Sequence, residues 1–208
     1  SASDGTVSAT GFIDGGVSAS STDGASISSG VFNAIGVSGL QNMDVGGVLD
    51  LTGQAQASGD VSAESVDSTA SATSTSGLPG IYGIKGALLD GDSDGTILGT
   101  AFGDFSTTAE STGDDAVASG SQSLVGIQTL SVDLGGTGSI TAISQDSNFV
   151  EASSVSGNAS ATASVNAIGL DGSGFSIASD AVITSSVSVD SVANASTIGG
   201  DSSPAAFY

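Results

Sequence analysis

The chain of 208 residues has no histidine, no cysteine and no tryptophan, and it has a single basic side chain. Without histidine no side chain ordinarily titrates near neutral pH, and without cysteine there is no thiolate nucleophile, disulfide or zinc–thiolate site. The sequence therefore excludes Ser-His-Asp and Cys-His catalysis. A carboxylate pair such as Asp114 with Asp115, or Glu110 across a sheet, could in principle cleave glycosides. Because sugar sites are normally built on aromatic platforms and aromatic residues make up only 4% of the chain, we predict that the protein is not an enzyme.

Charge of one sign is almost absent as well. Lys85 stands against 22 acidic residues, which gives a formal charge of −21. One cation cannot neutralise a row of phosphates, so nucleic acids and anionic membrane surfaces are poor partners. No apolar run approaches the roughly 18 residues of a membrane-spanning segment. The partners that remain are a cation, a cell-surface glycan or another protein, above all a second copy of this chain.

Charged residues of either sign make up 11% of the chain, less than half of the roughly 25% that is usual in soluble proteins. The surface must therefore consist mainly of Ser, Thr, Asn and Gly, a composition typical of extracellular structural material. The chain starts with "SASDG", a small-residue start of the kind that signal-peptide cleavage leaves. We therefore expect a secreted or cell-surface protein.

Small and polar residues alternate along much of the chain, as in "ASATASVNAIGL" from Ala159. A period of two indicates β-strands, whereas helices repeat every 3.6 residues. Alanine is common, but Ser, Thr and Gly separate its occurrences, so its helix propensity has no run over which to accumulate. We expect almost no helix.

The chain also repeats itself in a degenerate way. Ile35, Ile81, Ile127 and Ile168 mark corresponding places, at spacings of 46, 46 and 41 residues. We assign four repeats, preceded by a β arm or divergent first repeat and followed by a tail. The boundaries are 1–30 for the arm, 31–77, 78–123, 124–164 and 165–197 for the repeats, and 198–208 for the tail.

Alanine and serine cannot fill the space between sheets about 10 Å apart, so this sequence suits sheets that lie closer together. We predict an elongated all-β solenoid in which each repeat supplies three or four short strands and packs on its neighbours. The larger apolar stretches "GIYGIKGALL" and "TILGTAFGDF" would form a thicker part of the same unit. The alternative is a β-sandwich of the jelly-roll or immunoglobulin type, completed by a strand from another subunit.

The opening segment "DGTVSATGFID" resembles the donor strand of fimbrial pilins, which lend such a strand to the next subunit. The resemblance covers about ten residues, and the cysteine that follows in pilins is absent. More broadly, the acidic Ser/Thr/Gly repeats resemble secreted bacterial adhesins and surface-layer proteins. The first resemblance implies strand contacts between subunits, and the second implies a cell-surface module that calcium makes rigid.

The sharpest local motif is "LDGDSDGTI", in which Asp90, Asp92 and Asp94 alternate and a glycine follows. This spacing resembles the first half of an EF-hand or dockerin calcium loop, with the main-chain carbonyl of Thr96 as a further ligand. Ala101 stands where such loops carry a bidentate Glu. A remote carboxylate would have to complete the shell, and Asp104, Asp114 and Asp115 are the nearest in sequence. We therefore predict a Ca²⁺ site at this loop.

Three functions are compatible with these features. The first is a self-assembling extracellular structural protein, a subunit of a filament, sheath or surface layer. The second is a calcium-stabilised adhesin or stalk module. The third, a minor alternative, is an ice-binding solenoid, suggested by "STASATSTS" from Ser68, although its threonines do not recur at matching positions in the other repeats.

Overall fold

The computed structural model describes residues 4–41, 43–77 and 80–208. Within these residues all regular structure is β-strand, which confirms the expectation of almost no helix. No helix in this part of the chain is long and apolar enough to cross a membrane.

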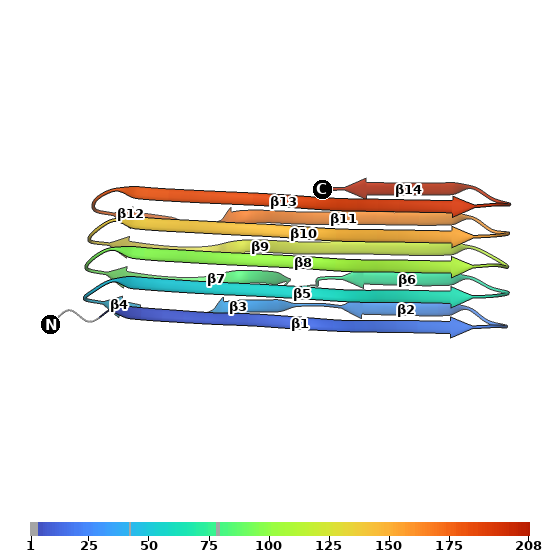
Figure 1. Cartoon of the computed structure of the whole chain (residues 1–208), viewed down its shortest axis with the longest axis horizontal. Coiled ribbons are helices and arrows are strands. Elements are labelled where there is room, and N and C mark those ends of the chain that lie inside the picture. The colour runs from blue at the N-terminus through green and yellow to red at the C-terminus, as the bar shows by residue number, and fades with distance from the viewer. Residues whose placement is uncertain (1–3, 42, 78–79) are drawn as a thin grey trace.

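One sheet consists of five parallel strands of 17 residues each, in the order β1-β5-β8-β10-β13. The strands pair without a shift along their full length, and successive strands begin 43 to 46 residues apart in sequence. The chain therefore winds through five coils that stack in register (Figure 1). The strands are β1 (Gly5–Ser21), β5 (Leu49–Ser65), β8 (Gly95–Ser111), β10 (Gly138–Ser154) and β13 (Ala181–Thr197).

The second sheet is formed by the returning half of each coil, and its strands also pair in parallel. The first coil returns in three pieces, the third in one continuous strand, and the fifth in a short strand only. These strands are β2 (Ser26–Val31), β3 (Ala34–Ser38), β4 (Met43–Val45), β6 (Ala70–Thr75), β7 (Ile81–Gly91), β9 (Ala116–Leu134), β11 (Ala159–Asp171), β12 (Gly174–Ile177) and β14 (Ser202–Phe207).

Two stacked parallel sheets of coiled chain form a β-solenoid, so the predicted fold class is confirmed. Two details of the prediction were wrong. The first, second and fourth coils contain the predicted three or four strands, but the third and fifth contain two, and the strands of the first sheet are not short, because each of them continues for 17 residues. The sandwich alternative fails because jelly-roll and immunoglobulin sheets are antiparallel, whereas every described strand pair here is parallel.

The sequence alignment of isoleucines also needs correction. Ile35 pairs with Tyr82, Tyr82 pairs with Val125, and Val125 pairs with Ile168. Ile35 and Ile168 therefore do occupy one row, but Ile81 lies one row before it and Ile127 two rows after it. The β1 strand, which resembles a donor strand, pairs with β5 of its own chain as the first coil.

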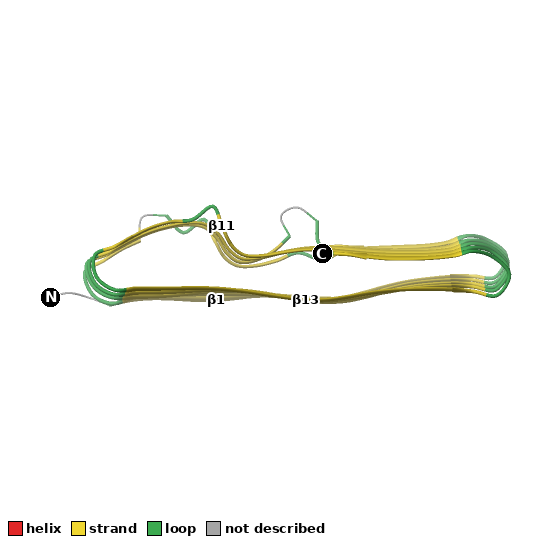
Figure 2. Cartoon of the chain, turned by 90° about the horizontal axis from the view of Figure 1, so that it is seen from above, coloured by secondary structure: helices red, strands yellow, loops and turns green. Residues whose placement is uncertain are grey.

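The two sheets approach closely at a waist near the middle of each coil (Figure 2). Gly36, Gly83, Gly126 and Gly169 occupy one row of the second sheet, since their flanking residues pair in register. A Cβ atom on Gly126 would lie 2.7 Å from the Ile143 nitrogen on the opposite sheet and 2.8 Å from the Gly169 carbonyl oxygen. Only glycine fits where the two backbones come this close.

Just beyond the waist, the second sheet bends at a left-handed residue in each of four coils. Gly39, Gly86 and Gly172 have φ angles of 66°, 68° and 57°, and Thr129 fills the equivalent place with a φ of 55°. A β-branched residue in this conformation is a genuine outlier. Beyond the waist the second sheet lies farther from the first, and this separation forms the wider end of the coil (Figure 2).

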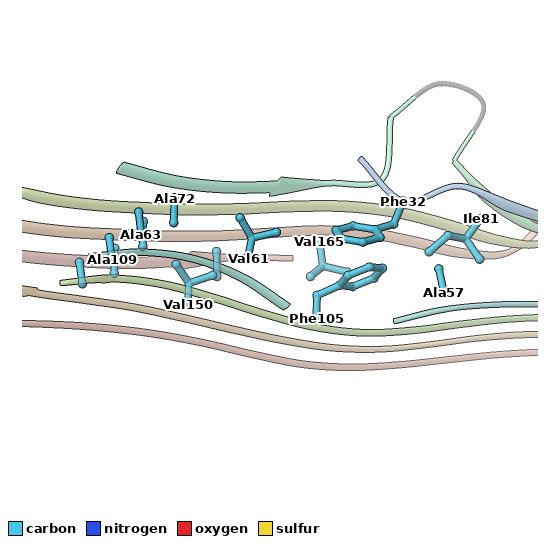
Figure 3. Close-up of a cluster of buried hydrophobic side chains, with 14 of the residues drawn as sticks. Phe32, Ala57, Val61, Ala63, Ala72, Ile81, Phe105, Ala109, Val150 and Val165 are labelled. Atoms are coloured by element: carbon cyan, nitrogen blue, oxygen red, sulfur yellow. The ribbon is translucent and has the colours of Figure 1, made fainter. Parts of the chain in front are cut away.

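Side-chain size follows the separation of the sheets. The wide end buries Leu and Ile, including Leu49, Ile97 and Ile140 from the first sheet with Ile84 and Leu134 from the second. The narrow end buries mainly alanine and holds one larger group, in which the rings of Phe32 and Phe105 lie 5.6 Å apart (Figure 3). Ile84, Ala87, Leu89 and Ile97 come from the apolar stretches that predicted a thicker part.

We expect Gly126→Ala to destabilise the protein by about 3 kcal/mol or more, because the new methyl group meets backbone atoms of both sheets, which cannot rotate away. The matched control is Gly174→Ala, where an added Cβ has open space. Urea unfolding followed by circular dichroism measures both variants. Equal stability of the two variants would show that the waist is not closely packed.

Candidate functional site

The clearest polar arrangement is a ladder of hydroxyl groups at the turn that ends each strand of the first sheet. Ser21, Ser65, Ser111, Ser154 and Thr197 are the final strand residues in the five coils. Each hydroxyl oxygen accepts a hydrogen bond from the backbone N–H three residues later, at 2.9 to 3.2 Å. From the second coil onward each hydroxyl also donates to a turn carbonyl of the preceding coil, at 2.6 to 3.0 Å.

Carboxylate and amide oxygens form a second ladder beside the first. Asp115 Oδ1 accepts the N–H of Asn158 at 2.7 Å, and Asn158 Oδ1 accepts the N–H of Asp201 at 3.0 Å. The same arrangement occurs at the opposite turn, where Asp4 Oδ1 accepts the N–H of Val48 at 3.0 Å. Both ladders run in one direction, because each coil offers an oxygen to the next coil.

These hydroxyl groups were not among the predicted site residues, although the sequence carries a signal for them. A turn of the form Ser/Thr followed by four variable residues and then Ala or Ser recurs in every coil, as in "STDGAS", "SVDSTA" and "STGDDA". Because Ser is so frequent in this chain, a Ser at one of these positions does not stand out from the other serines. The repeat of the whole turn at intervals of 43 to 46 residues would have identified it.

We expect Ser111→Ala to lower the free energy of unfolding by about 1 to 3 kcal/mol. The Ser111 side chain is buried, and its loss leaves the Asp114 N–H and the Ser68 carbonyl without this partner. Ser111→Thr should retain most of the stability, because Thr197 makes both bonds in the fifth coil. Thermal unfolding compares the two variants, and an equal loss in both would mean that shape rather than hydrogen bonding matters at this position.

The residues of the predicted calcium loop are placed in three different settings. Asp90 is exposed on the outer face of β7, Asp92 is exposed in the following turn, and Thr96 is exposed on the outer face of β8. Asp94 Oδ1 accepts the N–H of Thr137 at 2.7 Å and so belongs to the ladder of the turn. Among the residues that the structure describes, no group of three or more carboxylates is arranged to hold a metal ion. Calcium at this loop stays a prediction.

Asp90 belongs to a different row, which the sequence did not reveal. It pairs with Asp44 on one side and Asp133 on the other, so three carboxylates stand on adjacent strands. They line a groove of about 610 Å³ together with Leu88, Phe175 and neighbouring residues. Like charges directly opposite one another on a sheet are destabilising. The repulsion among these three carboxylates therefore disfavours the pairing of these strands.

One carboxylate faces the interior. The Asp146 side chain is 5% exposed, and neither of its oxygens has a hydrogen-bond partner. Asn148, two residues further along β10, is also buried, and its Nδ2 donates to the Gly120 carbonyl at 3.3 Å. Burial, with a contribution from the carboxylate of Asp104, raises the pKa of Asp146 to about 7.

The raised pKa makes stability depend on pH. Between the ordinary value of 3.8 and about 7, folded Asp146 holds a proton that the unfolded chain has released. Rising pH therefore destabilises the fold across this interval, by roughly 4 kcal/mol at most, and has no further effect through this group above it. Asp146→Asn should match the parent near pH 4 and be more stable by a few kcal/mol at pH 8.

Urea unfolding at several pH values measures this difference. Asp60→Asn, which removes one charge from the exposed outer face of the first sheet, is the control for net charge. A parallel pH dependence in the parent and in Asp146→Asn would contradict the assignment to Asp146.

Lys85, the single basic residue, lies half-buried on β7 with its Nζ 4.1 Å from the centre of the Tyr82 ring. A cation over an aromatic face is favourable by about 0.5 to 1 kcal/mol at exposed sites. Burial, followed by the influence of Asp171, raises the pKa of Tyr82. The one cation therefore packs against its own sheet.

Comparison with models of protein families, with curated proteins and with solved structures gave no significant match to this chain. The function is therefore argued from the geometry alone. Three features support a functional argument. They are the strand edges at the two ends of the stack, the hydrogen-bond ladders that run in one direction, and the distribution of carboxylates over the two faces.

Proposed function

We propose that this protein is an extracellular structural protein whose copies join end to end through their β-strands to form a filament, sheath or surface layer. The observation that carries the proposal is the repetition of one coil-to-coil interface. Within the described chain β1 and β13 each pair along one edge only, and so do β2 and β14. A second copy placed with β1 on β13 and β2 on β14 would continue the same parallel register.

The ladders make the two ends complementary. At the β13 end, the Gly200 carbonyl and the Asp201 carboxylate stand where Gly157 and Asn158 accept hydrogen bonds from the fifth coil. At the β1 end, the Ser21 hydroxyl and the Ala25 N–H occupy the donor positions of the same ladders. Acceptors at one end and donors at the other favour head-to-tail addition, which builds filaments rather than closed dimers.

Repulsion between carboxylates on the outer face of the first sheet opposes this end-to-end contact. One row of this face reads Asp14, Ser58, Asp104, Ser147 and Asp190, so that no two carboxylates of this row are neighbours within one copy. End-to-end addition would place Asp190 of one copy beside Asp14 of the next. Salt, protons or divalent cations would weaken this repulsion.

The first test is negative-stain electron microscopy of the purified chain in low salt with chelator, in high salt and in millimolar calcium. We expect filaments in high salt or calcium, and fewer in low salt with chelator. Isolated uniform particles in all three conditions would contradict the proposal and favour the adhesin or stalk module.

Asp190→Ser should promote assembly in low salt and lower the critical concentration about two- to five-fold, since removing a like-charge pair is worth about 0.5 to 1 kcal/mol. The matched control is Asp60→Ser, which removes the same charge from an exposed position on the same face in the second coil. Light scattering gives the critical concentration of each variant. Equal shifts in both variants would mean that net charge, and not the junction, controls assembly.

A further inference from the structure

One half of the second sheet has an outer face without any charged side chain. It comprises the outward residues of β2, β6, residues 116–121 of β9, residues 159–164 of β11, and β14, and we call it the uncharged face. Each of these five strands contributes three outward positions in register. The middle row reads Ser29, Thr73, Ser119, Thr162 and Ala205.

Such a face is unusual in a chain with 22 acidic residues and one basic residue. The outer face of the first sheet carries carboxylates on all five strands, among them Asp14, Asp60, Asp104, Glu151 and Asp190. The other half of the second sheet carries the row of Asp44, Asp90 and Asp133. Carboxylates are therefore present on the other broad surfaces and absent from this one.

The uncharged face also exposes large apolar side chains at its margins. Ile27 is 73% exposed, Val31 58%, Val117 40% and Phe207 59%, and all four point outward from it. The narrow end of the coil, where the two sheets run straight, carries this face (Figure 2). A flat array of small hydroxyl-bearing side chains with apolar margins can be brought against another such array without burying a charge.

We infer that the uncharged face packs against the same face of a second copy, so that end-to-end polymers associate laterally in face-to-face pairs. The charge distribution selects this occupant. Two charged faces would set carboxylates against carboxylates, and a charged face on the uncharged face would bury carboxylates without a partner. A contact of identical surfaces also satisfies the two-fold geometry of most homodimers.

The area of the uncharged face indicates how strong the contact between two copies can be. Five strands about 4.8 Å apart and six residues of about 3.3 Å each cover roughly 500 Å² per copy, or about 1,000 Å² in all. That is near the lower limit for a specific interface, so a single pair is weak. In a polymer the contact repeats in every subunit, and its strength multiplies. The inference about polymers therefore rests on the proposed function, whereas the pairing of two single copies does not.

The test is to place a charge on the face. Thr73→Glu and Thr162→Glu, both in the middle row, would each bury an unpaired carboxylate at the contact. Thr141→Glu is the matched control, because Thr141 is likewise half-buried, lies on an inner strand and has Leu98 and Thr184 as cross-strand neighbours. Circular dichroism confirms that all three variants keep their strands.

Sedimentation velocity at high protein concentration and low calcium measures pairing of single copies. We expect a concentration-dependent dimer for the parent and for Thr141→Glu, with a dissociation constant at least about ten-fold higher for Thr73→Glu and Thr162→Glu, because burying an unpaired charge costs several kcal/mol. A monomeric parent, or equal dimerisation of all four proteins, would overturn the inference.

Electron microscopy then separates this inference from the proposed function. Paired filaments for the parent and single filaments for Thr73→Glu support both. Single filaments for the parent overturn the lateral contact and leave the end-to-end contact standing. A parent that lowers the freezing point of water without dimerising, and loses this effect in Thr73→Glu but not in Thr141→Glu, would identify ice as the ligand of the face and overturn the inference.

Discussion

Stacking in register is the constraint on which the structure depends. Every strand pair in the described chain is parallel and unshifted, so each residue lies beside the equivalent residue of the next coil. A shift of one residue would turn every inward side chain of that coil to the solvent. The hydroxyl and carboxylate ladders at the turns add a second check on register, because their partners meet only when the coils are aligned. Small side chains suffice for such a fold, since backbone hydrogen bonds and close packing provide the cohesion.

The distance between the sheets then determines which residues occur where. Glycine occupies the waist because backbone atoms of the two sheets are almost in contact there. Alanine fills the narrow half, and leucine and isoleucine fill the half that opens beyond the left-handed bend. The composition of this chain, rich in Gly, Ala and Ser and poor in large residues, is therefore a direct consequence of two sheets that lie close together.

The sequence contained the fold class but not the register. Alternation as in "ASATASVNAIGL" is local and strong, so strands, the absence of helix in the described residues and a thin core could all be predicted. The register could not be predicted. Ile81 and Ile127 are the residues that align with Ile35 by type, whereas Tyr82 and Val125 are the residues that occupy its row. The row of glycines at the waist and the turn that begins with Ser or Thr carry the register. Both features repeat in the sequence, but Gly and Ser are so frequent in this chain that the repeats do not stand out. The hydrogen bond from the Thr137 N–H to Asp94 could not be predicted either, because the two residues lie 43 positions apart in the sequence.

The central claim of this account is that the interface between coils is also the interface between subunits. X-ray diffraction from aligned filaments tests it most directly. If copies add end to end, the strands lie across the filament, and the diagram has a meridional reflection near 4.8 Å, the spacing between strands. The subunit repeat along the axis would then be about 24 Å, the height of five coils. A 4.8 Å reflection on the equator, or its absence from well-aligned filaments, would contradict the account.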